Sequence, residues 1–193
     1  MKKWSKKKKL IRNLMILLLL VAGIVVGEIS LSGTYQDADT AHAASEATRH
    51  YGPSEIRAVL ADVDGSKRSY LGVYDKWYSV DTVIKDWKGW RIGNHYGTDE
   101  IDYQKPVNHS WHIYDDEITV YGIVCDPDIA SVEIGLRYGE QMVYVKQEEL
   151  FDDMFLFTQK RYHQGNSNEN EESVLAEIRG YDQNGTIIYS ENT

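Results

Sequence analysis

The chain has 193 residues and a formal net charge of −9. That length suffices for one domain with a full core once the N-terminal segment is set aside. Residues 1–13 contain seven of the 21 basic side chains and no acidic ones, so the remainder carries 14 basic against 30 acidic groups, a net charge of −16. Such an acidic body repels phosphate backbones, which excludes a nucleic-acid-binding function and favours a neutral or basic partner.

The N-terminus has the pattern of an export signal. Residues 1–13 are basic, and residues 14–27 form an uninterrupted apolar run. This run alone is short for a membrane span, but a span over residues 10–27 is long enough if the segment is retained.

A cleavage pattern follows the apolar run. Ala41-His42-Ala43 has the small-x-small pattern that signal peptidases recognise, although it lies well beyond the run. Residues 1–27 are therefore predicted to be either a cleaved signal peptide or a membrane anchor with its N-terminus in the cytoplasm. Both alternatives place residues 44–193 outside the cytoplasm, because the basic cluster stays on the cytoplasmic side. Cys125 is the sole cysteine of the chain and is expected to be a buried thiol, with an intermolecular disulfide as the alternative.

Beyond the leader, the sequence divides into a linker and a β-rich part. Residues 28–54 are rich in small and polar side chains without an apolar period, which predicts a flexible tether. Residues 55–193 are expected to form an extracytoplasmic β domain, because their dominant hydrophobic period is two. About ten short strands, with no convincing helix beyond the export signal, predict an all-β fold. The expected architecture is an antiparallel β-sandwich or open barrel, preceded by an N-terminal hydrophobic export or anchor helix.

Three of the five tryptophans, Trp77, Trp87 and Trp90, lie in one short span. A hairpin loop at Lys88-Gly89 would place Trp87 opposite Trp90, whereas a loop that begins at Trp87 would place Trp90 opposite Asp86 and on an apolar face. Register follows the burial of apolar side chains, which favours the second alternative. Trp90 is then a core residue and Trp87 lies at a turn. Trp77 is roughly 33 Å away at the other end of the strand, so the three do not form one platform.

Candidate binding residues lie on both sides of residue 100. Imidazole and carboxylate groups near residues 109–117 are suitable metal ligands, but His109 and His112 point to opposite faces of an extended strand. No metal site, catalytic constellation or cofactor is therefore assigned. The side chains selected for binding a ligand are Trp87, Tyr96, His109, Trp111 and His112.

Several segments together carry a family resemblance. With its Lys-rich leader and the segments GVYDKWYSVDTVIKDWKGWRI, ITVYGIVCDPDIASVEI and LAEIRGYDQNGTIIYS, the chain resembles small uncharacterised membrane-anchored or secreted extracytoplasmic proteins of Gram-positive bacteria. The resemblance implies a cell-envelope β domain and carries over no functional residues.

The expected function is a non-enzymatic binding or interaction domain, tethered to or secreted across the membrane. Its partner is expected to be a protein or an envelope component. Two alternatives remain open. One is an envelope hydrolase or metal-dependent enzyme that uses residues 109–117, and the other is a secreted inhibitor or immunity-type protein.

Overall fold

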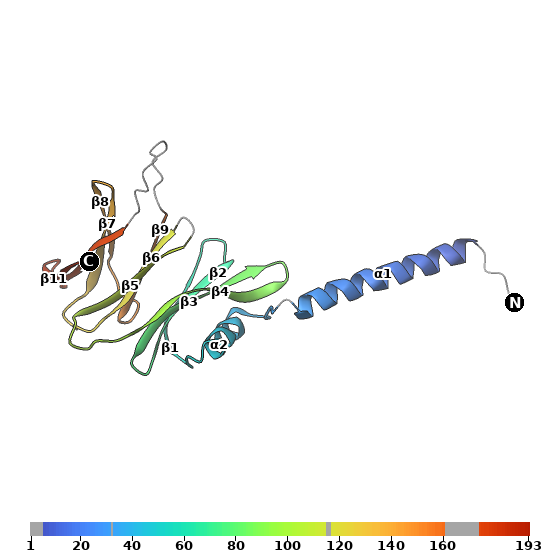
Figure 1. The fold of residues 1–193 in the computed structure, drawn as a ribbon, viewed down its shortest axis with the longest axis horizontal. Helices are drawn as coiled ribbons and strands as arrows, with labels where there is room; N and C mark the ends of the chain where they lie inside the picture. Colours follow the sequence, from blue (N-terminus) through green and yellow to red (C-terminus); the bar gives the residue numbers. More distant parts are fainter. Residues whose placement is uncertain (1–5, 32, 115–116, 161–173) are drawn as a thin grey trace.

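The computed structural model of the chain describes residues 6–31, 33–114, 117–160 and 174–193 (Figure 1). The described part has two helices and 11 strands, and all its strand pairs are antiparallel. The prediction of an all-β antiparallel fold preceded by an apolar helix is confirmed. The helices are α1 (Lys6–Leu31) and α2 (Ala38–Thr48). The strands are β1 (Glu55–Ala61), β2 (Lys67–Tyr74), β3 (Trp77–Asp86), β4 (Gly89–Glu100), β5 (Val107–Tyr114), β6 (Glu117–Val124), β7 (Ser131–Tyr138), β8 (Gln141–Gln147), β9 (Met154–Lys160), β10 (Val174–Tyr181) and β11 (Ile187–Asn192).

The strands form three sheets that lie in layers. The proximal sheet, which is nearest to α1, has the order β1-β2-β3-β4, the middle sheet β5-β6-β9, and the distal sheet β11-β10-β7-β8. Figure 1 shows these layers in succession, with α2 beside the proximal sheet and α1 extending away from the domain.

The central strand β6 joins two hydrophobic cores. On one of its faces, Ile118 packs in a cluster with Ile134 of the distal sheet. On its other face, Tyr121 belongs to a cluster with Tyr78 and Val80 of the proximal sheet. The sequence of β6 is apolar on both faces because each face is covered by another sheet. Strand β6 is therefore the central strand that the two cores share.

Helix α2 covers the other face of the proximal sheet. Its Ala41 is fully buried in a third cluster that includes Tyr70, Val83 and Trp90. The helix begins at a regular N-cap, where the Asp37 carboxylate accepts a hydrogen bond from the backbone N–H of Thr40 at 2.7 Å. The prediction of a flexible tether over residues 28–54, with no helix beyond the leader, is therefore wrong for α2. The buried side chains of this helix are small or polar, so they leave no apolar period in the sequence.

The β3–β4 hairpin has a register that differs from both predicted alternatives. Asp86 pairs with Gly89 and Lys85 pairs with Trp90, so the loop consists of Trp87 and Lys88. The Asp86 carboxylate accepts a hydrogen bond from the Lys88 backbone N–H at 2.8 Å, which stabilises this short turn. Trp90 is buried, as predicted, but it faces α2 rather than the core between sheets. Helix α2 covers the second face of the proximal sheet with apolar side chains. The observed register buries Trp90 against this helix.

Helix α1 has the dimensions of a membrane span. Its apolar segment Lys7–Gly27 has 21 residues and is not buried within the structure. At 1.5 Å per residue this segment is about 32 Å long, close to the thickness of a bilayer hydrocarbon core.

Candidate functional site

Two of the five residues selected for binding come together in the structure. Tyr96 on β4 and His112 on β5 line one cavity of about 410 Å³, which we call the β4–β5 cavity. The His112 ring also stacks on Tyr121, with centroids 6.1 Å apart. Strands β4 and β5 belong to neighbouring sheets, so the β4–β5 cavity lies where the proximal and middle sheets meet.

The other three selected residues lie apart from the β4–β5 cavity, so the five do not form one site. Trp87 is 73% exposed at the tip of the β3–β4 hairpin. Trp111 packs against the core between the middle and distal sheets. His109 lines a different cavity of about 460 Å³, which we call the acidic cavity. Burial lowers the pKa of His109 despite Glu191 at 3.9 Å.

The histidines of β5 do not share a metal site. His109 and His112 line separate cavities. Across residues 6–31, 33–114, 117–160 and 174–193, no group of three or more His, Cys, Asp or Glu side chains is arranged to hold a metal ion. Asp115 and Asp116, which belong to the metal-dependent alternative, lie outside the described residues.

A buried carboxylate lies behind the wall of the β4–β5 cavity. Asp81 on β3 is 3% exposed, and its Oδ1 accepts a hydrogen bond from Nη1 of Arg49 at 3.0 Å. Its Oδ2 lies 3.3 Å from Nδ1 of His42, and Nδ1 of His95 lies 3.7 Å from Oδ1. Burial alone would raise the pKa of Asp81, but His42, His95, Ser45 and the charge of Arg49 outweigh it and hold that pKa below its usual range. Asp81 is therefore an ionised anchor for side chains from α2 and β4.

His42 is held on its other sides by aromatic and acidic groups. Its ring stacks on Tyr70 with centroids 4.2 Å apart and an interplanar angle of 3°. Its Nε2 lies 3.4 Å from a carboxylate oxygen of Glu46, one helical turn further along α2. Tyr70 in turn donates a hydrogen bond to Asp39 at 2.6 Å, and burial together with this carboxylate raises the pKa of Tyr70. These contacts fix α2 on the proximal sheet through polar groups rather than through a large apolar face.

Arg49 connects this buried network to the open cavity. It borders a narrow space of about 10 Å³ beside Asp81 and also lines the β4–β5 cavity. Its hydrogen bonds to Ser45 and Asp81 both use Nη1. A guanidinium has five N–H donors, so donors on Nη2 and Nε remain, and within the described part of the chain they make no hydrogen bond. The buried Asp81 thus positions a cation at the edge of the cavity.

The β4–β5 cavity differs in charge from the rest of this acidic domain. None of its described lining residues carries a carboxylate. They are Arg49, Gly93, Asn94, His95, Tyr96, His112, Ile113 and Tyr114. The acidic cavity, by contrast, is lined by the carboxylates of Asp99, Glu100, Asp102 and Glu191. Hydrogen-bond donors and aromatic faces are the groups that recognise a polar or anionic small molecule. The β4–β5 cavity has the size and chemistry for such a ligand.

Sequence patterns did not reveal the network behind this site. Alternation along β3 places Asp81 on the face opposite the apolar side chains, which predicts a solvent-facing carboxylate when no helix covers that face. The signal that was available is the Asp37 cap followed by an alanine-rich segment over residues 38–48, which has high helix propensity. His42 and Arg49 are about two helical turns apart, so a helix brings both to one face.

Comparison of the chain with protein-family models, with curated proteins and with solved structures finds no match.

Proposed function

We propose that the chain is a membrane-anchored extracytoplasmic binding protein without catalytic activity of its own. Helix α1 is the anchor, and the β domain displays the β4–β5 cavity outside the cytoplasm. The basic run from Lys6 to Lys9, followed by Arg12, precedes the apolar segment and favours a cytoplasmic N-terminus. The length and exposure of the apolar segment Lys7–Gly27 support a membrane span.

The packing of α2 favours a retained anchor over a cleaved signal peptide. Cleavage after Ala43 would fall inside α2 and detach Ala41 and His42 from the folded domain. The detached segment would take with it the fully buried Ala41 and the His42 contact to Asp81. Residues before the cleavage pattern are therefore part of the domain, and secretion after cleavage is the less favoured alternative.

The observation that carries the binding function is the β4–β5 cavity itself. A cationic Arg49, positioned by the buried Asp81, borders a lining whose described residues include no carboxylate, in a domain that is otherwise strongly acidic. We therefore propose that the ligand is an envelope component with an anionic or hydrogen-bond-accepting group. Tyr114 and His112 supply aromatic faces for its less polar part.

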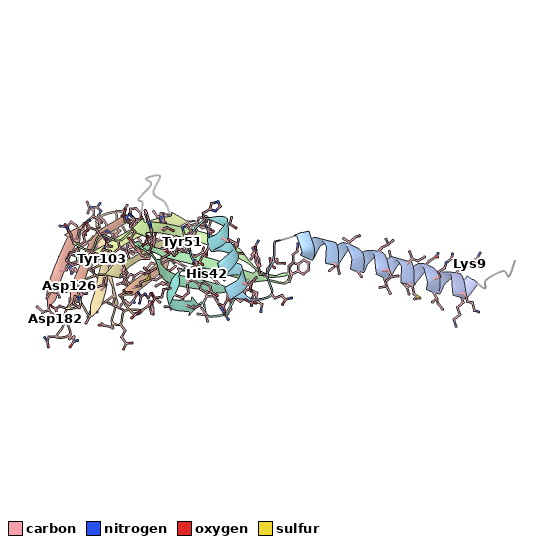
Figure 2. All side chains as sticks on the ribbon, turned by 90° about the horizontal axis from the view of Figure 1, so that it is seen from below. Lys9, His42, Tyr51, Tyr103, Asp126 and Asp182 are labelled. Carbon is pink, nitrogen blue, oxygen red and sulfur yellow. The ribbon has the colours of Figure 1, made fainter. Side chains whose placement is uncertain are left out.

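The proposal is tested by capture from envelope extracts with the full chain in detergent micelles. The cavity variant carries His112→Ala and Tyr114→Ala, and the control variant carries Tyr103→Ala. Tyr103 is a comparably exposed aromatic residue on the side of the domain away from α1 (Figure 2). We expect one component to be enriched on the wild type and on the control and to be lost from the cavity variant. Equal capture by all three chains, or no enrichment on any, would contradict the proposed site.

A further inference from the structure

The tip of the β3–β4 hairpin carries an exposed aromatic side chain beside a basic group. Trp87 is 73% exposed, the largest exposed fraction of any tryptophan, tyrosine or phenylalanine in the described ranges. The Lys88 ammonium lies 5.1 Å from the centre of its ring. A single exposed apolar side chain is ordinary on a protein surface, so the surroundings of Trp87 decide what the tip can contact. The β4–β5 cavity does not use this tip, because neither residue lines it.

The chain connection holds this tip close to the end of α1. Helix α1 ends at Leu31, and Tyr35 pairs with Trp90 through hydrogen bonds of 2.6 and 2.9 Å between backbone groups. Four Cα–Cα steps keep Tyr35 within about 15 Å of Leu31, whatever the orientation of the helix. The apolar segment ends at Gly27, and the remaining turn of α1 up to Leu31 adds about 6 Å to the distance between this segment and Tyr35. The hairpin tip therefore lies near the place where the chain leaves the apolar span, as Figure 1 also shows.

The charge of the hairpin is opposite to that of the domain as a whole. Lys85, Lys88 and Arg91 belong to the hairpin. Lys85 and Arg68, which lies on the neighbouring strand β2, are over the Trp90 ring at 5.7 and 5.2 Å from its centre. Asp86 is the one acidic side chain between residues 84 and 92. A basic, aromatic tip suits a lipid headgroup surface, because tryptophan prefers the membrane interface and lysine or arginine attracts anionic lipids.

The neighbouring β1–β2 turn reaches the same end of the proximal sheet. Its Ser66 carbonyl accepts a hydrogen bond from the Lys85 backbone N–H at 2.6 Å. Val63 in this turn is fully exposed, with a relative exposure of 109%. The carboxylates of Asp62 and Asp64 also lie in this turn, so the basic character is confined to the hairpin tip, and Val63 adds a second apolar side chain at this end.

We propose that the β3–β4 hairpin tip, with Trp87 at its centre, docks into the phospholipid headgroup layer of the membrane that α1 spans. This inference rests on the proposed function, in which α1 is a retained anchor. Docking of the tip gives the domain a second contact with the membrane besides α1. Two contacts fix the tilt of the domain, so that the distal sheet points away from the bilayer and the acidic body stays off the anionic surface.

Tryptophan quenching by brominated lipids tests the docking. The full chain is reconstituted into vesicles of phosphatidylcholine with a minority of phosphatidylglycerol, with and without bromine on the acyl chains. Three chains are compared, the wild type, Trp87→Phe and Trp77→Phe. Trp77 is the matched control because it lies at the opposite end of β3 from the hairpin tip. The remaining tryptophans are common to all three chains and give the same background.

We expect Trp87→Phe to lose a large part of the bromolipid-sensitive emission that Trp77→Phe retains. Unchanged quenching in Trp87→Phe would overturn the inference. Carbonate extraction of the same vesicles separates this failure from a failure of the proposed function. Protein that resists extraction but shows no Trp87 quenching contradicts docking alone, whereas protein that is extracted contradicts the anchor itself. A Lys85→Gln, Lys88→Gln variant is expected to reduce Trp87 quenching, and unchanged quenching would contradict the role of the basic groups.

Discussion

Asp81 is the side chain on which the packing of α2 depends most. Its carboxylate is buried and contacts Arg49 at 3.0 Å and His42 at 3.3 Å. Removing one partner of a buried ion pair leaves the other groups desolvated without compensation, which costs about 3–5 kcal/mol. We expect Asp81→Asn to lower the free energy of unfolding by that amount at neutral pH, measured by urea denaturation. Asp128→Asn, at an exposed carboxylate, is the control and should change stability by less than about 0.5 kcal/mol.

The same carboxylate predicts a pH dependence with a definite sign. Burial opposes ionisation of Asp81, but contacts with His42, His95, Ser45 and Arg49 outweigh it and place the folded-state pKa below the unfolded value near 3.8. The stabilisation is therefore complete above the unfolded pKa and is lost as the pH falls through the folded one. We expect the stability difference between wild type and Asp81→Asn to shrink below about pH 4. A difference that stays constant between pH 7 and pH 3 would show that folding does not shift the pKa of Asp81.

Cys125 is only partly buried, although the sequence predicts a buried thiol. Its Sγ accepts a hydrogen bond from Nδ2 of Asn108 at 3.4 Å, and burial raises the pKa of the thiol. Because the thiolate is the reactive species, we expect slow labelling by a disulfide reagent at pH 8 in the native protein and fast labelling in urea. Equal rates in the two states would contradict protection of the thiol by burial, and a dimer that disappears on reduction would support the intermolecular disulfide.

At the scale of elements, strands with one or two apolar faces were predictable and helix α2 was not. Most of the strand segments follow from alternation or from continuous apolar runs, because a sheet that buries one face imposes a period of two. Helix α2 escapes the same reasoning because it buries alanines and the polar side chains of His42 and Ser45. Its absence from the prediction also explains the error in the register of the β3–β4 hairpin.

The candidate site could be predicted only in part from the sequence, because it depends on contacts between separate elements. Tyr96 and His112 lie on strands of different sheets, and no local pattern says which strands two sheets bring together. Both were selected from the sequence for their aromatic or imidazole side chains, and both line the β4–β5 cavity. Arg49, which supplies the charge of the cavity, lies in the segment predicted to be a tether.

The β3–β4 hairpin, which pairs with the segment before α2, has beside its turn a position where only glycine fits. Gly89 has a φ of +138°, and a Cβ there would lie 2.8 Å from the carbonyl oxygen of Tyr35. Both the backbone strain and the close contact oppose a side chain, so we expect Gly89→Ala to cost about 2–3 kcal/mol. Gly65→Ala is the matched control, because Gly65 also has a positive φ of +72° but has open space around it. Equal losses of thermal stability in the two variants would mean that the Tyr35 contact contributes nothing.

At the scale of the whole molecule, the structure is a continuous stack that begins at α1. Helix α1 leads within a few residues to Tyr35, which pairs with β4, and then to α2 on the proximal sheet (Figure 1). The middle and distal sheets follow through the two cores on β6. Because these layers share cores, the distal sheet is positioned by the proximal one. An anchor linked in this way would give the domain a defined orientation, which a flexible tether over residues 28–54 would not provide.

This continuity makes the boundary of the leader measurable by truncation. A chain that starts at residue 33 keeps Tyr35, the Asp37 cap and all of α2, whereas one that starts at residue 44 mimics cleavage after Ala43. The shorter chain loses the buried Ala41 and the His42 contact to Asp81. Loss of one partner from that buried network costs about 3–5 kcal/mol, which for a domain of this size lowers the melting temperature by about 10 °C or more.

We therefore expect the chain of residues 33–193 to unfold cooperatively near the temperature of the full chain, and the chain of residues 44–193 to be strongly destabilised and sensitive to protease. Thermal unfolding followed by circular dichroism measures the difference. A third chain that starts at residue 33 and carries Asp81→Asn separates the loss of this contact from the loss of the helix, and its stability should lie between the other two. If residues 44–193 matched residues 33–193 in stability, cleavage near Ala43 would leave an intact domain, and the argument for a retained anchor would fall.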